Sequence, residues 1–175
     1  MYWFISDTHL GHFNIIRYCN RPFKSLEEMD STIIKNINER VKDTDVLFVL
    51  GDFCMKKSSE APEGKTFEYY RNKINCKNVI FCKGNHDSNN STKTIIESIV
   101  IEHGGKRIYM THNPKFAKKD FHWNFCGHVH GKFGKFVRCS DKSIIVDLSV
   151  ENWKYMPVDI NEINQAYSFW LKEKK

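Results

Sequence analysis

Apolar residues in the first half of the chain form short runs separated by helically spaced positions. The runs Tyr2 to Ser6, Val46 to Leu50 and Val79 to Cys82 have the length and the β-branched or aromatic content of buried strands. Between the first two runs, apolar residues from Leu26 to Val41 recur every three or four positions, which predicts a helix. This alternation of strands and helices predicts a largely parallel sheet.

Weaker patterns complete the first half. Ser25 and Glu28 resemble a capping box at the start of the long helix. Short helices are expected at Asn14 to Tyr18 and at Thr66 to Ile74. The intervening segment Lys56 to Lys65 is polar, contains Pro62 and Gly64, and predicts a loop.

The second half has a different pattern of short strands and turns. Ile99 to His103 and Lys106 to Thr111 flank a Gly-Gly pair and predict a hairpin. We expect a strand at Trp123 to Cys126 and an antiparallel pair formed by two further segments, Lys135 to Arg138 and Ser143 to Ser149. The second half is therefore predicted to be antiparallel. A final helix at Asn161 to Lys172 carries an apolar stripe that is expected to pack in the core: Ile163, Ala166, Tyr167 and Trp170.

Length and composition narrow the class of protein. The 175 residues, 41% of them hydrophobic, suit one domain spanning residues 1–175 and exclude a disordered chain. No apolar stretch is long enough to cross a membrane, and no secretory signal is evident, so we expect a soluble cytoplasmic protein. The six cysteines form no CxxC pair and are predicted to be buried thiols: Cys19, Cys54, Cys76, Cys82, Cys126 and Cys139.

Polar side chains follow the predicted strands at the points where these strands end. The segment Val79 to Asp87 illustrates this, because Asn85, His86 and Asp87 come directly after a buried run and Gly84. Taken alone, this segment could equally be a solvated turn. The same pattern recurs along the chain, and ligands of parallel sheets collect beyond the carboxyl ends of strands. The candidate site residues are Asp7, His9, Asp52, Asn85, His86, His112, His128 and His130.

Five of the eight histidines belong to this set. One histidine at a strand end is more often structural than functional, but five at corresponding positions favour a shared site. Imidazoles combined with carboxylates and one amide oxygen form a mixed nitrogen and oxygen set. Such a set favours first-row transition metals over Mg²⁺ or Ca²⁺, and its size suits two ions.

These motifs together resemble the calcineurin-like metallophosphoesterases. The family signature DxH, GD, GNH[DE], H and GHxH is present in order as Asp7 to His9, Gly51-Asp52, Gly84 to Asp87, His112 and Gly127 to His130. The resemblance implies an α/β fold, a four-layer αββα sandwich of two mixed β-sheets flanked by helices, with the metals at one edge.

The same resemblance implies roles for individual residues. Asp7, His9 and His130 would hold one metal ion, and Asn85, His112 and His128 the other, with Asp52 bridging both. Manganese is the first choice for the two divalent ions, with iron, nickel, zinc and cobalt as alternatives. A metal-bridging hydroxide would attack phosphorus. His86, oriented by Asp87, would donate a proton to the leaving group, or both residues would only support the site.

The candidate site implies that the substrates are phosphate esters. Without a long insertion that would build a cap, the site should be open, which favours a phosphodiesterase, with broad phosphomonoesterase or nuclease activity as near alternatives. The non-enzyme alternative is a metal-binding interaction scaffold. Substrate contacts are predicted for four residues near the ligand motifs: His12, Arg17, Arg21 and Lys115.

The net charge of +6 and several lysines near the motifs suggest nucleotide or nucleic-acid partners, unless these lysines are only solvated surface residues. The lysines are Lys56, Lys57, Lys83, Lys115, Lys118, Lys119, Lys132 and Lys135. Nearby aromatic residues could stack on a base but are more often part of the core: Phe116, Phe121, Trp123 and Phe133.

Overall fold

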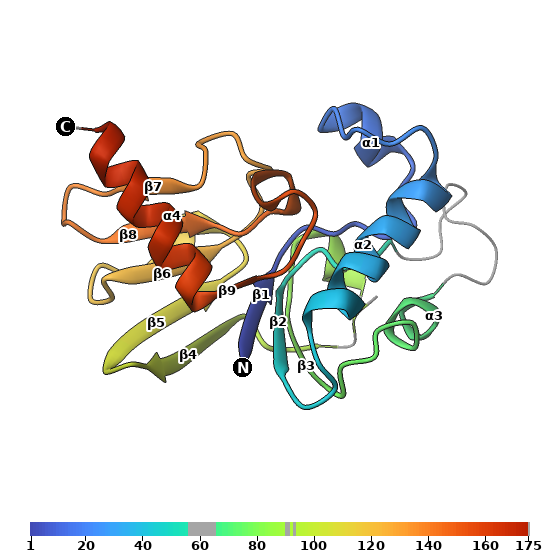
Figure 1. Ribbon diagram of the computed structural model, residues 1–175, viewed down its shortest axis with the longest axis horizontal. Coiled ribbons are helices and arrows are strands. Elements are labelled where there is room, and N and C mark those ends of the chain that lie inside the picture. Colours follow the sequence, from blue (N-terminus) through green and yellow to red (C-terminus); the bar gives the residue numbers. More distant parts are fainter. Residues whose placement is uncertain (56–65, 90–91, 93, 175) are drawn as a thin grey trace.

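The computed structural model describes residues 1–55, 66–89, 92 and 94–174. Two β-sheets pack against each other, with helices around them (Figure 1). The first sheet has four strands in the order β3-β2-β1-β9, and the second has five in the order β4-β5-β6-β8-β7. Both sheets are mixed, which confirms the predicted fold class. Within the described residues, no helix has the length and apolarity needed to cross a bilayer.

The first sheet is parallel except at one edge. Strands β1 (Tyr2–Ile5), β2 (Val46–Leu50) and β3 (Asn78–Cys82) run parallel, as predicted. Strand β9 (Val158–Asp159) pairs antiparallel with β1 and was not predicted. Its two residues are too few to produce a periodic pattern in the sequence.

Helices α1 (Asn14–Tyr18), α2 (Leu26–Arg40) and α3 (Phe67–Arg71) lie on the side of the first sheet that is away from the second sheet, at the right in Figure 1. Helix α2 buries its apolar stripe against the first sheet. At its start the Ser25 hydroxyl accepts a hydrogen bond from the Glu28 backbone. The Glu28 carboxylate, however, accepts from Lys24 rather than from Ser25, so only half of the predicted capping box forms.

Two other predictions concern this region. Helix α3 is shorter than the predicted span of Thr66 to Ile74, because the chain turns after Arg71. The predicted loop at 56–65, with Pro62 and Gly64 and the basic residues Lys56 and Lys57, lies outside the described residues.

The second sheet corrects the prediction of an antiparallel second half. Its strands are β4 (Ser98–His103), β5 (Lys106–Thr111), β6 (Trp123–Cys126), β7 (Phe136–Arg138) and β8 (Ile144–Asp147). The pairs β4–β5 and β7–β8 are antiparallel as expected, but β5, β6 and β8 run parallel. The connections between these three strands are longer than hairpin turns, so the chain can return to the starting edge before each new strand.

Helix α4 (Ile160–Glu173) packs in the core, as its apolar stripe predicted. The Tyr167 ring lies 4.9 Å from that of Trp123, while Phe125 contacts Phe4 of β1 with ring centroids 5.0 Å apart. Residues two apart in a strand share a face, so α4 and the first sheet cover the same face of the second sheet. On the opposite face, Asn124 is held by the backbone of Lys118 and Phe121.

The cysteines are free thiols, in agreement with the prediction. Four of them are buried: Cys54, Cys76, Cys82 and Cys126. Cys19 and Cys139 are only half-buried, which the sequence did not predict.

Candidate metal centre

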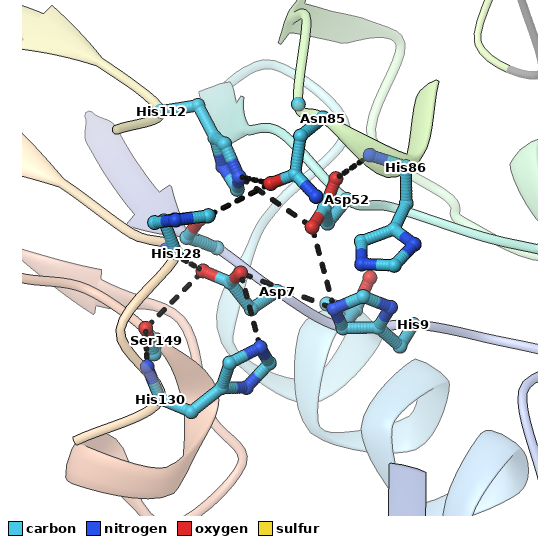
Figure 2. Close-up of polar contacts among 12 residues, drawn as sticks. Asp7, His9, Asp52, Asn85, His86, His112, His128, His130 and Ser149 are labelled. Atoms are coloured by element: carbon cyan, nitrogen blue, oxygen red, sulfur yellow. Dashed lines mark hydrogen bonds and ion pairs between the residues drawn. The ribbon is translucent and has the colours of Figure 1, made fainter. Parts of the chain in front are cut away.

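The loops that follow β1, β2, β3, β5 and β6 bring the predicted ligands together. Figure 2 shows these side chains converging from segments far apart in the sequence. They divide into two groups, which we call the Asp7 lobe and the Asn85 lobe, and Asp52 lies between them. The Asp7 lobe comprises Asp7, His9 and His130, and the Asn85 lobe comprises Asn85, His112 and His128.

Short distances define each group. In the Asp7 lobe, Asp7 Oδ1 lies 3.9 Å from His9 Nε2 and 3.7 Å from His130 Nε2. In the Asn85 lobe, Asn85 Oδ1 lies 2.9 Å from His112 Nε2 and 2.7 Å from His128 Nδ1. Each lobe therefore places an oxygen between two imidazole nitrogens.

Asp52 faces both lobes through one oxygen. Its Oδ2 lies 3.5 Å from His9 Nε2 and 3.4 Å from His112 Nε2. Its Oδ1 accepts a hydrogen bond from the backbone of His86 (2.9 Å), which fixes the carboxylate plane. A single carboxylate oxygen is thus available to two sites at once.

The backbone at the ligands is strained. Asp7, His9, Asp52, His128 and His130 all have φ between 50° and 73°, in the left-handed region that residues other than glycine rarely adopt. Such conformations cost about 1–3 kcal/mol each and persist where the surrounding structure enforces them, commonly at functional sites. Five of the seven candidate ligands have this left-handed backbone conformation. It distinguishes their loops from ordinary solvated turns, which were the alternative interpretation of the sequence.

Two glycines allow the loops to approach one another. A Cβ at Gly84 would lie 2.1 Å from Asp52 Oδ1, and one at Gly127 would lie 2.2 Å from Asp7 Oδ2. Gly84 does not have a positive φ, so this position does not need the left-handed conformation that glycine allows. Its role is to provide space for Asp52.

The donor atoms fit a metal better than they fit one another. Asp7 Oδ1 and His9 Nε2 are buried and have no hydrogen-bond partner within the described part of the chain. Groups of three ligand atoms lie within 4.8 Å of one another in Asp7, His9 and His130, and again in Asp7, Asp52 and His112. Buried polar atoms are normally paired, and a divalent cation would satisfy these.

The electrostatics of the cluster favour positive charge. Burial raises the pKa of Asp52, but the hydrogen bond and charge of His112 outweigh burial and hold the Asp52 pKa well below its usual range. Burial lowers the pKa of His112, yet Asp52 and Asp7 raise it to about 9. Burial dominates at His9, whose pKa is lowered despite the Asp52 charge. Buried carboxylates thus attract a cation, whether a proton or a metal ion.

His86 and Asp87 differ in exposure and contacts. The His86 side chain is exposed, and its ring centroid lies 5.2 Å from that of His9. Asp87 is buried, and its Oδ2 accepts hydrogen bonds from the backbone of Asp52 (2.9 Å) and Gly84 (2.8 Å). Asp87 therefore ties two ligand loops together, and its predicted effect on the His86 ring remains a prediction.

Arg21 corrects a predicted substrate contact. Its guanidinium is buried and donates to the backbone oxygens of Asp7 (2.7 Å) and Thr8 (2.9 Å) and to Glu151 Oε1 (2.8 Å). These partners use its donors inside the protein, so Arg21 cannot contact a substrate phosphate. It positions the Asp7 loop instead.

Glu151 was missed by the sequence reasoning. Its Oε1 lies 3.0 Å from His130 Nδ1, which directs Nε2 of that ring toward Asp7. Burial lowers the pKa of His130, but Cys19 and Glu151 raise it to about 10. Glu151 follows an apolar segment without a recognisable motif, and nothing in the sequence alone connects it to His130.

A second missed group anchors the His130 loop. Asp147 Oδ2 accepts from the Gly131 backbone (2.9 Å), and Asp147 Oδ1 accepts from the Ser149 backbone (2.9 Å). The Ser149 hydroxyl accepts from the His130 backbone (3.2 Å) and lies 3.2 Å from Asp7 Oδ2 (Figure 2). The predicted strand was extended to Ser149, which concealed that Asp147 stands at a strand end like the other site residues.

The remaining predicted contacts lie around the centre. His12 is buried with its ring centroid 5.5 Å from that of His9, while Arg17 and Lys115 are exposed. A cavity of about 470 Å³ adjoins the Asn85 lobe and is lined by Asn85 and His112 together with Lys83, Lys115, Lys118 and Phe116. Trp123 belongs to the core, whereas Phe116 and Phe133 are exposed. Three of the predicted lysines and one predicted aromatic residue therefore line this cavity, and their role in binding a nucleotide remains a prediction.

The fold is a sandwich of two sheets that carries candidate carboxylate, imidazole and amide ligands at one edge. The family model described as calcineurin-like phosphoesterase matches residues 2–173, and the chain belongs to this family. It is 36% identical over 163 residues to the uncharacterized protein MJ1445 of Methanocaldococcus jannaschii, with 90% of this chain and 87% of that protein covered.

A solved structure shows a similar fold. The protein of unknown function AQ665 from Aquifex aeolicus superposes with a TM-score of 0.70 at 27% identity, covering 95% of this chain and 98% of that one. A more distant likeness is the phosphoesterase Yfce from E. coli, with a TM-score of 0.45, 17% identity and coverage of 85% and 77%.

Proposed function

We propose that this protein is a divalent-metal-dependent phosphodiesterase. The observation that carries the proposal is the position of Asp52 Oδ2, 3.5 Å from His9 and 3.4 Å from His112. This oxygen would be shared by two ions, one in the Asp7 lobe and one in the Asn85 lobe. Manganese is the first choice, with iron, nickel, zinc or cobalt as alternatives, because the ligands mix nitrogen and oxygen.

When bound, divalent ions here would acidify an attacking water and neutralise the charge that develops on the phosphoryl oxygens. The protein's own contribution is to hold the ligands rigidly. His112 Nδ1 donates to the Leu50 backbone oxygen (2.8 Å), and Glu151 fixes the His130 ring in the same way. These contacts select the ring orientation, so little reorganisation is needed when a substrate binds.

His86 is the residue we propose as the proton donor. Its side chain is exposed beside the Asp7 lobe, and its backbone is tied to Asp52. From this position the ring could protonate the leaving oxygen, a step that commonly contributes about 10²–10⁴-fold to a rate. Asp87, by holding Asp52 and Gly84, would keep His86 at the edge of the site.

A specific observation favours nucleotides as substrates. The cavity beside the Asn85 lobe is lined by three lysines, and Glu97 is the one acidic residue among its described lining. Phe116 is 54% exposed there, with Lys115 Nζ 4.7 Å from its ring centroid. Phosphate would be attracted by the lysines and a base could stack on the ring. Phosphomonoesters and nucleic acids remain within the same chemistry.

The experiment is a hydrolysis panel with purified protein and added Mn²⁺. We expect turnover of bis-p-nitrophenyl phosphate that disappears with chelator. His86→Ala should keep both metal ions and lose about 10²–10³-fold on an ester with a poor leaving group, but much less on a p-nitrophenyl ester, whose leaving group needs no proton.

His103→Ala is the matched control, since His103 is exposed at the end of β4. Full activity of His86→Ala on the poor leaving group would remove the acid role. Bound metal without turnover on cyclic nucleotides, dinucleotides, oligonucleotides and monoesters would support the interaction scaffold instead.

A further inference from the structure

Three donor groups converge on the side of His130 that faces away from Asp7. Cys19 follows α1, and Glu151 lies in the short 3-10 helix Val150–Trp153. One ligand atom from each of Cys19, His130 and Glu151 lies within 4.8 Å of the other two. The three residues come from separate parts of the chain, so the fold rather than local sequence assembles them.

The Glu151 carboxylate is incompletely satisfied in this cluster. Its Oε1 receives hydrogen bonds from Arg21 (2.8 Å) and faces His130 Nδ1 (3.0 Å). Its Oε2 is buried and has no hydrogen-bond partner among the residues that the structure describes. An unpaired carboxylate oxygen away from water is costly, and a cation bound by this carboxylate would remove the cost.

We propose that Cys19, His130 and Glu151 bind a zinc-class divalent cation at a site distinct from the two ions of the proposed function. Sulfur, imidazole nitrogen and carboxylate oxygen together form a ligand set that Zn²⁺ prefers, and Mn²⁺ does not favour thiolate. Binding would form bonds to the Cys19 sulfur, to His130 Nδ1 and to the carboxylate. It would release the thiol proton and the Nδ1 proton to solvent, with no change in oxidation state.

The charges of the site are compatible with this occupant. The Cys19 thiolate, the Glu151 carboxylate and His130, which becomes an imidazolate when both of its nitrogens hold ions, together offset the two charges of the ion and the charge of Arg21. Arg21 would continue to donate to Glu151 Oε1 and to the Asp7 backbone oxygen. Glu151 Oε2 would therefore be available to the cation. The two nitrogens of His130 would then serve two different sites.

Cobalt provides a direct test, because thiolate ligation of Co²⁺ produces a charge-transfer band in the near ultraviolet. The ligands of the Asp7 and Asn85 lobes are nitrogen and oxygen and produce no such band. We expect the band when the metal-free protein is titrated with Co²⁺. Cys19→Ser should abolish it, whereas Cys139→Ser, the other half-buried cysteine, should retain it.

Glu151→Gln is expected to raise the Co²⁺ concentration for half-maximal absorbance at least about tenfold, as loss of a ligand should. A band that persists in Cys19→Ser, or that never appears in the wild type at saturating Co²⁺, would overturn the proposal. If Cys19→Ser fails to fold, alkylation of the wild-type protein replaces it. Zn²⁺ should slow iodoacetamide labelling of Cys19 but not of Cys139, and equal rates at Cys19 with and without Zn²⁺ would refute the site.

One consequence rests on the proposed function. Because His130 also belongs to the Asp7 lobe, excess Zn²⁺ should inhibit hydrolysis by the wild type more than by Cys19→Ser. Absence of hydrolysis with any ester would contradict the proposed function and leave the cobalt band unaffected. Loss of the band with hydrolysis intact would contradict only this site.

Discussion

The two lobes of the candidate metal centre are built from similar imidazoles but differ in charge and burial. The Asp7 lobe contains a carboxylate, and Asp7 and His9 are almost completely buried. The Asn85 lobe contains a neutral amide, and Asn85 is exposed while His128 is half-buried. A divalent ion in the first lobe faces two carboxylates, counting Asp52, and an ion in the second lobe faces one.

Their supporting contacts differ as well. Arg21 and Glu151 fix the Asp7 lobe from behind, while the Asn85 lobe opens into the cavity lined by Lys115 and Phe116. Under the proposed function the two lobes would have different tasks. The Asp7 lobe would hold an ion tightly, and the Asn85 lobe would combine weaker ion binding with access for a substrate.

The largest loss of hydrolysis is expected from substitution of Asp52, the residue that the two lobes share. Asp52→Asn should lower hydrolysis by about 10³-fold and reduce metal content, because a metal ion supplies several kcal/mol of transition-state stabilisation. Asp45→Asn is the control, since Asp45 precedes β2 as Asp52 follows it and is buried in hydrogen bonds to Met1 and Trp3. Two tightly bound ions in Asp52→Asn, measured by elemental analysis after gel filtration, would disprove the shared ligand.

The asymmetry of charge predicts an order of metal loss. Asn85→Ala should retain about one ion per chain, whereas Asp7→Asn should retain less than one, because it removes a charge that the Asn85 lobe lacks. Asn85→Asp should bind its ion more tightly than the wild type. Metal content measured after stepwise chelation tests this order. Retention of one ion by Asp7→Asn together with loss of both from Asn85→Ala would reverse the comparison.

Binding of the substrate's base should depend on the cavity beside the Asn85 lobe alone. Phe116→Ala should lower kcat/KM about 5–150-fold for thymidine 5′-p-nitrophenyl phosphate, since stacking of a base on an aromatic ring contributes about 1–3 kcal/mol. Methyl p-nitrophenyl phosphate, which lacks the base, should be hydrolysed at an unchanged rate. Phe169→Ala is the matched control, because Phe169 is similarly exposed on α4 with Lys172 near its ring. Equal losses on both esters would exclude a base-binding role.

The sequence predicts the candidate ligands of the two lobes better than it predicts the residues that hold these ligands in place. Asp7, Asp52 and His112 could be recognised because each lies at the end of a buried apolar run, and the resemblance to the family implied the assignment of the ligand set. Glu151 and Asp147 act through contacts formed only in three dimensions, so no local pattern marks them. Arg21 was assigned to substrate because charge near a motif resembles an anion site, whereas its burial can be seen only in the folded protein.

The fold shows the same limit. Strand positions follow from local apolar runs, and nearly all strands were located correctly. Strand direction depends on how long connections cross the sheet, and the parallel arrangement of β5, β6 and β8 could not be inferred from hairpin signals. Gly84 illustrates the point at one residue, because its need for space arises from Asp52 in another loop.

The smallest expected effect is on the stability of the metal-free protein, and its pH dependence distinguishes the two lobes. The pKa of His112 is raised from 6.5 to about 9 and that of His130 to about 10, since their carboxylate partners outweigh burial. A histidine with a raised folded-state pKa contributes stability that is complete below its unfolded pKa and is lost as pH rises toward the folded value. In chelator, the free energy of unfolding should therefore fall between about pH 6.5 and pH 8.5, by at most about 1.4 kcal/mol per pH unit for each imidazole.

Urea unfolding of the metal-free protein at several pH values measures this slope. Asp52→Asn should reduce the part due to His112 and Glu151→Gln the part due to His130, so the larger reduction identifies the lobe that binds its proton more strongly. A slope of zero in the wild type would mean that neither carboxylate holds its histidine in the charged form.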